Sequence, residues 1–251
     1  MPSPFKDSQL NIFIATGNRD KFKRIAGWLE GMDVNFVGPH DLDPELASLT
    51  KVTDAEEKLA GDMLSRAKLK ADKAAKVISK LSRNTVILGQ DETAYLPWLD
   101  QEFVDLRFPH KIELNGNLLA EEVTERLTGY KLANFYIDLV AKVATDKLMR
   151  EEIGSDAKAE HKFMPIDWRF ALAAIGPDSG KSADVIARWN VRQYIFATPL
   201  SPDEPDDGYV IGKVSADSPL QKAGTINRHK LPETEPVEAL QKYLRTMQYP
   251  N

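Results

Sequence analysis

The chain of 251 residues contains no cysteine, which excludes disulfide bonds, thiol catalysis and cysteine-ligated zinc sites. It also lacks an excess of positive charge: 33 lysines and arginines face 38 aspartates and glutamates, and the formal net charge is −5. This balance gives no electrostatic footprint for nucleic acid or an anionic membrane, so a polyphosphate ligand would need a local basic cluster and a metal. No apolar run approaches the ~20 residues that a membrane helix requires.

The residues that are present are typical of a globular α/β protein. The N-terminus lacks the basic and apolar regions of a signal peptide, so we expect a cytoplasmic protein. Strands and helices alternate early and strands pair later, which predicts a mixed sheet flanked by helices. The expected strands are 11–15, 34–37, 85–88, 168–175 and 183–197, and the expected helices are 20–31, 54–81 (interrupted at Gly61), 117–152 (with a break near Gly129) and 236–247.

The first motif that carries chemistry is Thr16-Gly17-Asn18, followed in the first helical turn by Lys21. It lies where a predicted strand passes into a helix. Such a turn presents unpaired backbone N–H groups and the positive end of the helix dipole to an anion. The side chains of Thr16 and Asn18 can add donors, and Lys21 can reach a phosphate. Alone, the motif also fits an ordinary capped helix.

The second motif is Gln90-Asp91-Glu92, predicted at the end of a buried strand. Open α/β sheets bind ligands in the crevice at this edge. Asp91 is therefore a candidate to hold Mg²⁺ or to accept a proton from water, with a turn-capping aspartate as the alternative.

The third motif is Glu56-Glu57 at the start of the long helix, with Lys70 farther along. Acidic residues in a first helical turn also complement the helix dipole, and Lys70 also fits a solvated helix face. A glycine-rich stretch at 176–182 resembles a phosphate loop, but it has three residues between its glycines where the Walker pattern needs four, so we expect a hairpin turn there.

Taken together, these pieces resemble the inosine triphosphate pyrophosphatase family. IFIATGNRDKFKRIAGWLEG is similar to its opening strand, TGNxxK loop and first helix, and LKADKAAKV is similar to the following helix. TVILGQDET stands where the family has a strand ending in a DDSG-like motif. WRFALAAIGPDSGKSADVIARW resembles its central hairpin, and Arg228-His229-Lys230 resembles its SHR element. All five pieces occur in the family's order.

The resemblance implies an elongated, two-lobed α/β domain over 1–251 with a helical insertion at 115–165, usually a homodimer. It implies Mg²⁺-dependent hydrolysis of ITP, dITP or XTP to monophosphate and pyrophosphate. The implied metal ligands are Glu57 and Asp91, with Glu56 or Glu45 in place of Glu57 as alternatives. The implied catalytic residues are Asp91, Lys21 and Lys70, and the implied substrate-binding residues are Thr16, Gly17, Asn18, Lys21, Lys70, Tyr209, His229 and Lys230.

Two departures from the family pattern keep alternatives open. Gln90 replaces the first aspartate of the DDSG-like motif, which also allows a nucleotide-binding protein without catalysis. Asp207-Gly208-Tyr209 is the only remnant of a segment that helps to form the base pocket. A related pyrophosphatase acting on another nucleotide is therefore a further alternative.

Overall fold

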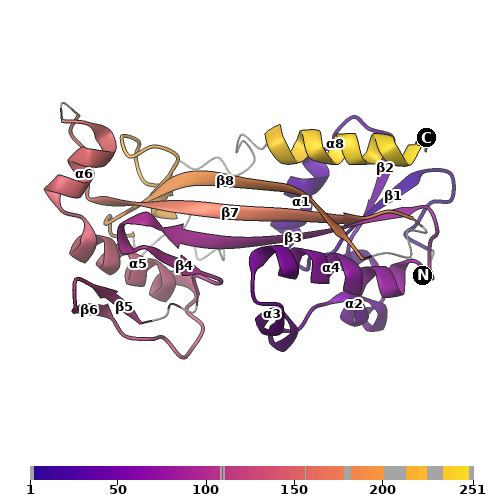
Figure 1. Ribbon diagram of the computed structural model, residues 1–251, viewed down its shortest axis with the longest axis horizontal. Helices are drawn as coiled ribbons and strands as arrows, with labels where there is room; N and C mark the ends of the chain where they lie inside the picture. Colours follow the sequence, from indigo (N-terminus) through magenta and orange to yellow (C-terminus); the bar gives the residue numbers. More distant parts are fainter. Residues whose placement is uncertain are drawn as a thin grey trace. The chain divides into compact units, whose positions relative to one another are not determined.

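The computed structural model describes residues 3–107, 109, 111–155, 157–177, 182–200, 213–224 and 234–248. Within them, helices and strands form the α/β fold that the sequence predicts (Figure 1). The chain divides into two compact units. Unit 1 comprises Met1–Glu92, Phe170–Trp189 and Pro232–Asn251, and unit 2 comprises Thr93–Arg169 and Asn190–Leu231. No helix among the described residues is long and apolar enough to cross a membrane.

Most strands belong to one mixed sheet. The strands are β1 (Leu10–Ile14), β2 (Val34–Val37), β3 (Thr85–Leu96), β4 (Gln101–Phe103), β5 (Ile112–Leu114), β6 (Asn117–Ala120), β7 (Phe163–Ile175), β8 (Asp184–Phe196) and β9 (Ser215–Ala216). The main sheet has the order β2-β1-β3-β7-β8-β9, and β4 also pairs with β3. β1 is parallel to β2 and β3, whereas β4 and β9 are antiparallel to their neighbours. The predicted mixed sheet is confirmed.

The helices of unit 1 cover both faces of its part of the sheet. The described helices are α1 (Arg19–Gly27), α2 (Pro44–Thr50), α3 (Asp54–Ala60), α4 (Met63–Ile78), α5 (Gly129–Val143), α6 (Asp146–Ile153) and α8 (Thr234–Gln248), with 3₁₀ turns at Pro39–Asp41 and Pro97–Leu99. In unit 1, α4 lies on one face, and α1 and α8 lie on the other (Figure 1). Side chains of β3 that follow one another therefore face different helices.

Gly89 of β3 permits an unusually close approach of α4. A Cβ at this position would lie 2.7 Å from the backbone nitrogen of Ala71 and closer still to the carbonyl oxygen of Ala67. The helix presents only small side chains here, since Ala67, Ala71 and Ala74 are all fully buried. This contact sets how far α4 lies from β3. It therefore also sets how far the longer side chains of α4 reach toward the strand.

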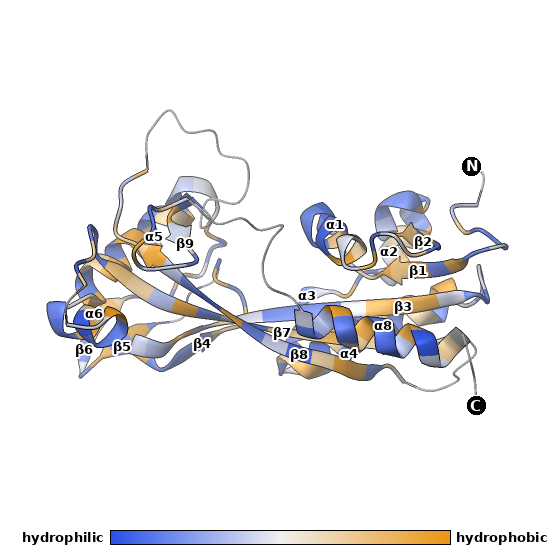
Figure 2. Cartoon of the chain, turned by 90° about the horizontal axis from the view of Figure 1, so that it is seen from above, coloured by the Kyte–Doolittle hydropathy of each residue, from blue (hydrophilic) through white to orange (hydrophobic). Residues whose placement is uncertain are grey.

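Apolar strands form the interior of unit 1. Ile12, Phe13 and Ile14 of β1 are buried, and Figure 2 shows hydrophobic residues along β1 and hydrophilic residues over much of α1. β1 pairs with β3 from Asn11↔Thr85 to Ile14↔Leu88. Because both parallel strands are covered on two sides, the apolar run is nearly continuous, as expected for a buried parallel pair.

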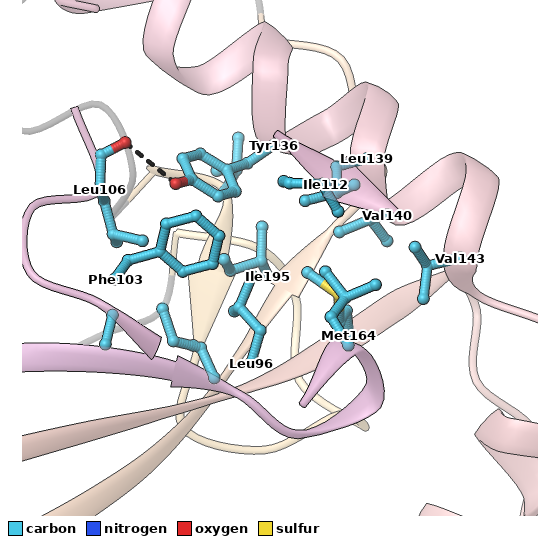
Figure 3. Packing of buried hydrophobic residues seen from close by; sticks show 14 of the residues in the cluster. Leu96, Phe103, Leu106, Ile112, Tyr136, Leu139, Val140, Val143, Met164 and Ile195 are labelled. Atoms are coloured by element: carbon cyan, nitrogen blue, oxygen red, sulfur yellow. Dashed lines mark hydrogen bonds between the residues drawn. The ribbon is translucent and has the colours of Figure 1, made fainter. Parts of the chain in front are cut away.

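Unit 2 has its own core, built around α5 and the strands beside it. Tyr136 of α5 is fully buried, and its hydroxyl donates to the Leu106 carbonyl oxygen at 2.9 Å (Figure 3). Burial raises the pKa of this phenol. The surrounding cluster includes Leu96, Phe103, Ile112, Leu139, Val140, Val143, Met164 and Ile195. The hydrogen bond satisfies the one polar group that Tyr136 brings into this apolar environment.

The structure corrects two of the predicted elements. The strand predicted at 85–88 continues to Leu96, so Asp91 lies inside β3 and not at its end. The polar sequence at 90–92 suggests a strand end, but ion pairs and antiparallel pairing with β4 carry the strand onward. The helical stretch predicted from 117 begins with β6, and α5 starts only at Gly129. Because α6 starts at Asp146, the break between the two helices lies at 144–145 and not near Gly129.

Candidate functional site

The loop after β1 leads directly into α1. Asn18 is the N-cap of α1, and its side-chain oxygen accepts from the backbone nitrogens of Asp20 (2.9 Å) and Lys21 (3.1 Å). The hydroxyl oxygen of Thr16 accepts from the backbone nitrogen of Asn18 at 3.2 Å. These bonds hold the loop in one shape, but they also occupy two of the N–H groups that the sequence analysis offered to an anion.

A cavity of about 560 Å³ opens above this loop, and all of its lining residues belong to unit 1. It is lined by Ala15, Thr16, Gly17, Lys21, Pro39, His40, Pro44, Ala47, Ser48, Thr50, Lys51, Val52, Glu57, Lys70 and Gln90. Three lysines and a single carboxylate therefore line it. Such a positive cavity of this size suits a polyanionic small molecule.

Asp91 is nearly buried, with 6% of its surface exposed, and it is paired with two cations of α4. Its Oδ2 accepts from Arg66 Nε at 2.6 Å, and its Oδ1 contacts the Lys70 ammonium. Lys70 Nζ also lies 2.9 Å from Glu57 Oε1. Burial lowers the pKa of Lys70, but attraction to Asp91 and Glu57 outweighs it, so the pKa is raised and the ammonium stays charged.

Glu92 points to the opposite face of β3, toward α1. Its carboxylate lies 3.2 Å from Lys21 Nζ and 3.8 Å from Arg24 Nη2. Burial raises its pKa, but the charges of Lys21 and Arg24 overcome this effect and lower it. Gln90 shares this face and accepts a hydrogen bond from Arg24 at 3.2 Å. Glu92 therefore holds Lys21 in place and does not join Asp91.

The three alternative metal-binding glutamates are separated by the structure. Glu57 lines the cavity. Glu56 instead closes a capping box with Thr53 and binds Lys73 at 2.6 Å, and these bonds, with Lys73 the largest cause, lower its pKa to about 2. Glu45 lies in the first turn of α2, is exposed and is not among the lining residues. Of the three, only Glu57 shares a partner with Asp91.

Arg66 is a site residue that the sequence analysis missed. Its guanidinium is 2% exposed, bonds Asp91 and the Gly61 carbonyl oxygen, and within the described part of the chain leaves Nη2 buried without a hydrogen-bond partner. The available signal was its spacing, because residues four apart such as Arg66 and Lys70 lie on one helix face. His40 also lines the cavity, with its ring edge-on to that of Phe22 and the two ring centroids 4.5 Å apart.

Three predicted substrate-binding residues, Tyr209, His229 and Lys230, lie outside the described residues. The same holds for most of the turn predicted at 176–182, of which 178–181 are not described. Of the residues that the resemblance assigns to the triphosphate, Thr16, Gly17, Lys21 and Lys70 line one cavity, whereas Asn18 caps α1 and is not among the lining residues. All of these binding roles remain predictions.

The carboxylates at the cavity are few, which limits the kind of metal site that they can form. No group of three or more histidines, aspartates and glutamates among the described residues is arranged to hold a metal. Mg²⁺, however, is often held by one or two carboxylates together with water and substrate phosphates. Glu57 and Asp91 both contact the one ammonium of Lys70, so they can face a single cation. The residues fit Mg²⁺ that shares its ligands with a bound phosphate.

The fold and the cavity define an α/β protein with a cationic cavity beside the loop that follows β1. Its fold is similar to that of the Staphylococcus aureus Ham1 protein, with a TM-score of 0.51 and 16% identity over 94% of this chain and 98% of that chain. This likeness agrees at the level of the fold with the resemblance seen in the sequence.

Two further solved structures align over most of both chains. A HAM1 protein from Coxiella burnetii has a TM-score of 0.45 and 13% identity, covering 94% of this chain and 98% of that one. The nucleoside-triphosphatase / dITP/XTP pyrophosphatase from Mycobacterium abscessus has a TM-score of 0.41 and 12% identity, covering 96% and 98%. No protein-family model and no curated protein sequence matches the chain.

Proposed function

We propose that this protein hydrolyses purine nucleoside triphosphates with hypoxanthine or xanthine bases (ITP, dITP and XTP) to monophosphate and pyrophosphate, with Mg²⁺. The observation that carries the proposal is the cationic cavity beside the Thr16-Gly17-Asn18 loop, with Lys21 and Lys70 in its lining. The order of the sequence motifs and the Ham1-like fold also support it.

The side chains suggest a division of roles around the triphosphate. Lys21 and Lys70 bind phosphate oxygens, while Thr16 and Gly17 shape the loop beneath them. Asp91 Oδ1 accepts a proton from the water that attacks the α-phosphorus, and the bond from that phosphorus to the pyrophosphate oxygen breaks. Arg66 keeps the Asp91 carboxylate in place through Oδ2. Most of the catalysis is then positioning and charge stabilisation.

Glu57 and Asp91 are the residues that would hold Mg²⁺. The ion supplies positive charge for the phosphate oxygens and lowers the pKa of bound water. Once Lys70 turns to a phosphate, Asp91 has only Oδ1 available, because Oδ2 remains bonded to Arg66. Oδ1 therefore acts either as this metal ligand or as the base, and not as both at once.

The test is pyrophosphate release from a panel of nucleoside triphosphates that includes ITP, XTP, the four common ribonucleotides and modified pyrimidine nucleotides, with and without Mg²⁺. Metal-dependent release that favours ITP or XTP is the expected result. Release that favours a pyrimidine nucleotide would instead support the related-pyrophosphatase alternative. That result would assign the difference in base preference to the predicted base-binding residues, which lie outside the described part of the chain.

Nucleotide binding without hydrolysis is the second candidate function. Two observations favour it: both oxygens of Asp91 are engaged by cations, and Gln90 replaces an acidic residue and bonds Arg24. Calorimetric binding of ITP with no pyrophosphate release over hours would support this candidate and exclude the hydrolytic one.

We also propose a cytoplasmic homodimer that does not bind nucleic acid. The resemblance supports the dimer, and the net charge of −5 supports the absence of nucleic-acid binding. Light scattering coupled to gel filtration measures the dimer directly, and a monomeric mass at micromolar concentration contradicts it.

A further inference from the structure

We infer that the Lys70 ammonium is a built-in counter-ion, which occupies the divalent-cation position between Glu57 and Asp91 until an anionic ligand draws it away. Lys70 Nζ lies 2.9 Å from Glu57 Oε1 and also contacts Asp91 Oδ1. One monovalent cation thus bridges the two carboxylates that face each other across it. The displacing anion is the phosphate of the proposed function, on which this step rests. The competition between the Lys70 ammonium and a divalent cation is independent of hydrolysis.

The two cations on Asp91 differ in their freedom to move. Arg66 is 2% exposed, and its Nε bonds Asp91 Oδ2 at 2.6 Å while Nη1 bonds the Gly61 carbonyl oxygen. The side chain of Lys70 is more exposed, at 18%, and it lines the cavity. Its four-carbon stem allows the ammonium to swing, whereas a planar guanidinium held at two points is fixed. Lys70 is therefore the cation that can leave.

The charges of this cluster explain why a metal is excluded at rest. Glu57 and Asp91 contribute two negative charges, and Arg66 and Lys70 contribute two positive charges, so the cluster is neutral. A divalent cation entering it gains little attraction and meets the repulsion of Lys70 at contact distance. When a triphosphate arrives, its oxygens can take the ammonium and supply further metal ligands at the same time. The metal then enters with the nucleotide and not before it.

The test uses Mn²⁺ alone, with no nucleotide, and measures its binding by the loss of the free-ion paramagnetic resonance signal. Lys70→Met removes the charge and keeps most of the stem, and we expect it to bind Mn²⁺ at least about tenfold more tightly than wild type. Lys70→Arg keeps the charge and should bind Mn²⁺ as weakly as wild type. Lys73→Met is the matched control, because Lys73 lies on the same helix but pairs with Glu56 outside the cavity. Equal binding by Lys70→Met and wild type would overturn the inference.

A second variant locates the gained site. Glu57→Gln should abolish the gain when combined with Lys70→Met, and should leave Mn²⁺ binding unchanged in the wild-type background, where the position is closed. Weaker binding by Glu57→Gln alone would mean that the position is already open, and it overturns the inference even if Lys70→Met fails to fold. Neither result depends on pyrophosphate release, so failure of the proposed function is recorded separately.

Discussion

Asp91 and Glu92 are consecutive residues of β3, yet their carboxylates hold lysines from different helices. Asp91 contacts Lys70 of α4, and Glu92 lies 3.2 Å from Lys21 of α1. The alternation of side chains along a strand produces this division, because one carboxylate faces each side of the sheet. Both lysines line the same cavity. Two adjacent residues of one strand thus position two of the three lysines that line the cavity.

Replacing Asp91 by asparagine should abolish pyrophosphate release and also destabilise the protein. The loss of activity follows from its proposed role, and the loss of stability follows from Arg66, whose buried charge would lose its partner. Breaking a buried ion pair costs on the order of 3 kcal/mol. Urea unfolding measures the stability, and activity is assayed where the variant remains folded.

The control for this variant is Asp72→Asn. Asp72 also belongs to unit 1 and accepts from the Ala183 backbone nitrogen at 2.6 Å, but it does not line the cavity. Its kcat and KM should match those of wild type. An Asp91→Asn variant that turns over at the wild-type rate removes Asp91 from the reaction.

Lys21→Met should raise the KM for a triphosphate at least about tenfold, because a charge-assisted hydrogen bond to phosphate is worth about 1.5–3 kcal/mol. Steady-state kinetics at constant ionic strength measures the change. Lys23→Met is the matched control, since Lys23 is exposed on the same helix and is not among the lining residues. Equal KM values for the two variants would contradict a phosphate role for Lys21.

Gly89→Ala should destabilise unit 1 by roughly 1–3 kcal/mol, the usual range for an overpacked interior. The new methyl group would meet backbone atoms of Ala67 and Ala71, which cannot rotate away. Gly27→Ala provides the contrast, because its added Cβ meets nothing within 4 Å and alanine favours the helix. Chemical denaturation compares the free energies of unfolding of the two variants. A Gly89→Ala variant as stable as wild type would argue against close packing of α4 on β3.

Glu56→Gln should lower the melting temperature at neutral pH and have no effect near pH 2. The bonds from Lys73 and Thr53 lower the pKa of Glu56 from 4.5 to about 2 in the folded state. A depressed carboxyl pKa stabilises the fold above the unfolded value of 4.5, and this contribution is lost as the pH falls toward 2. Thermal unfolding between pH 7 and pH 2 follows the difference in melting temperature, which salt should reduce because the Lys73–Glu56 pair is only partly buried. A difference that stays constant with pH would contradict this origin.

The sequence predicted the elements that have a clear period or a clear boundary. β2 has the predicted bounds of 34–37, and Gly61 separates α3 from α4 where the break was expected. Thr16, Lys21 and Lys70, which the resemblance assigns to the triphosphate, line one cavity, and their binding role stays a prediction. These features depend on local propensity and on the general rule that loops after parallel strands form ligand sites.

The parts of the fold and of the site that the sequence did not predict depend on tertiary contacts, which no local sequence pattern reveals. Asp91 was expected at a strand end because polar residues usually stop a buried strand, but Arg66 and Lys70 neutralise it inside β3. Arg66 was overlooked because α4 carries several basic residues, and its four-residue spacing from Lys70 does not by itself show that both reach a strand aspartate. Glu56 and Glu57 are adjacent in the sequence, and only packing decides which of them faces the cavity.

Gly89 also changes how distant relatives of this chain can be sought. A search for its charged residues alone would accept any strand aspartate near any helical lysine. Arg66 and Lys70 reach Asp91 from α4, and α4 can lie this close to β3 only because position 89 has no side chain. The glycine is therefore as much a requirement of the cluster as its charged residues. The pattern Arg-x-x-x-Lys on a helix, followed by Gly-x-Asp on the next strand, therefore specifies both the ion pairs and the close helix–strand packing that they require. A chain with the charges and a larger residue in place of the glycine should not be able to build this cluster.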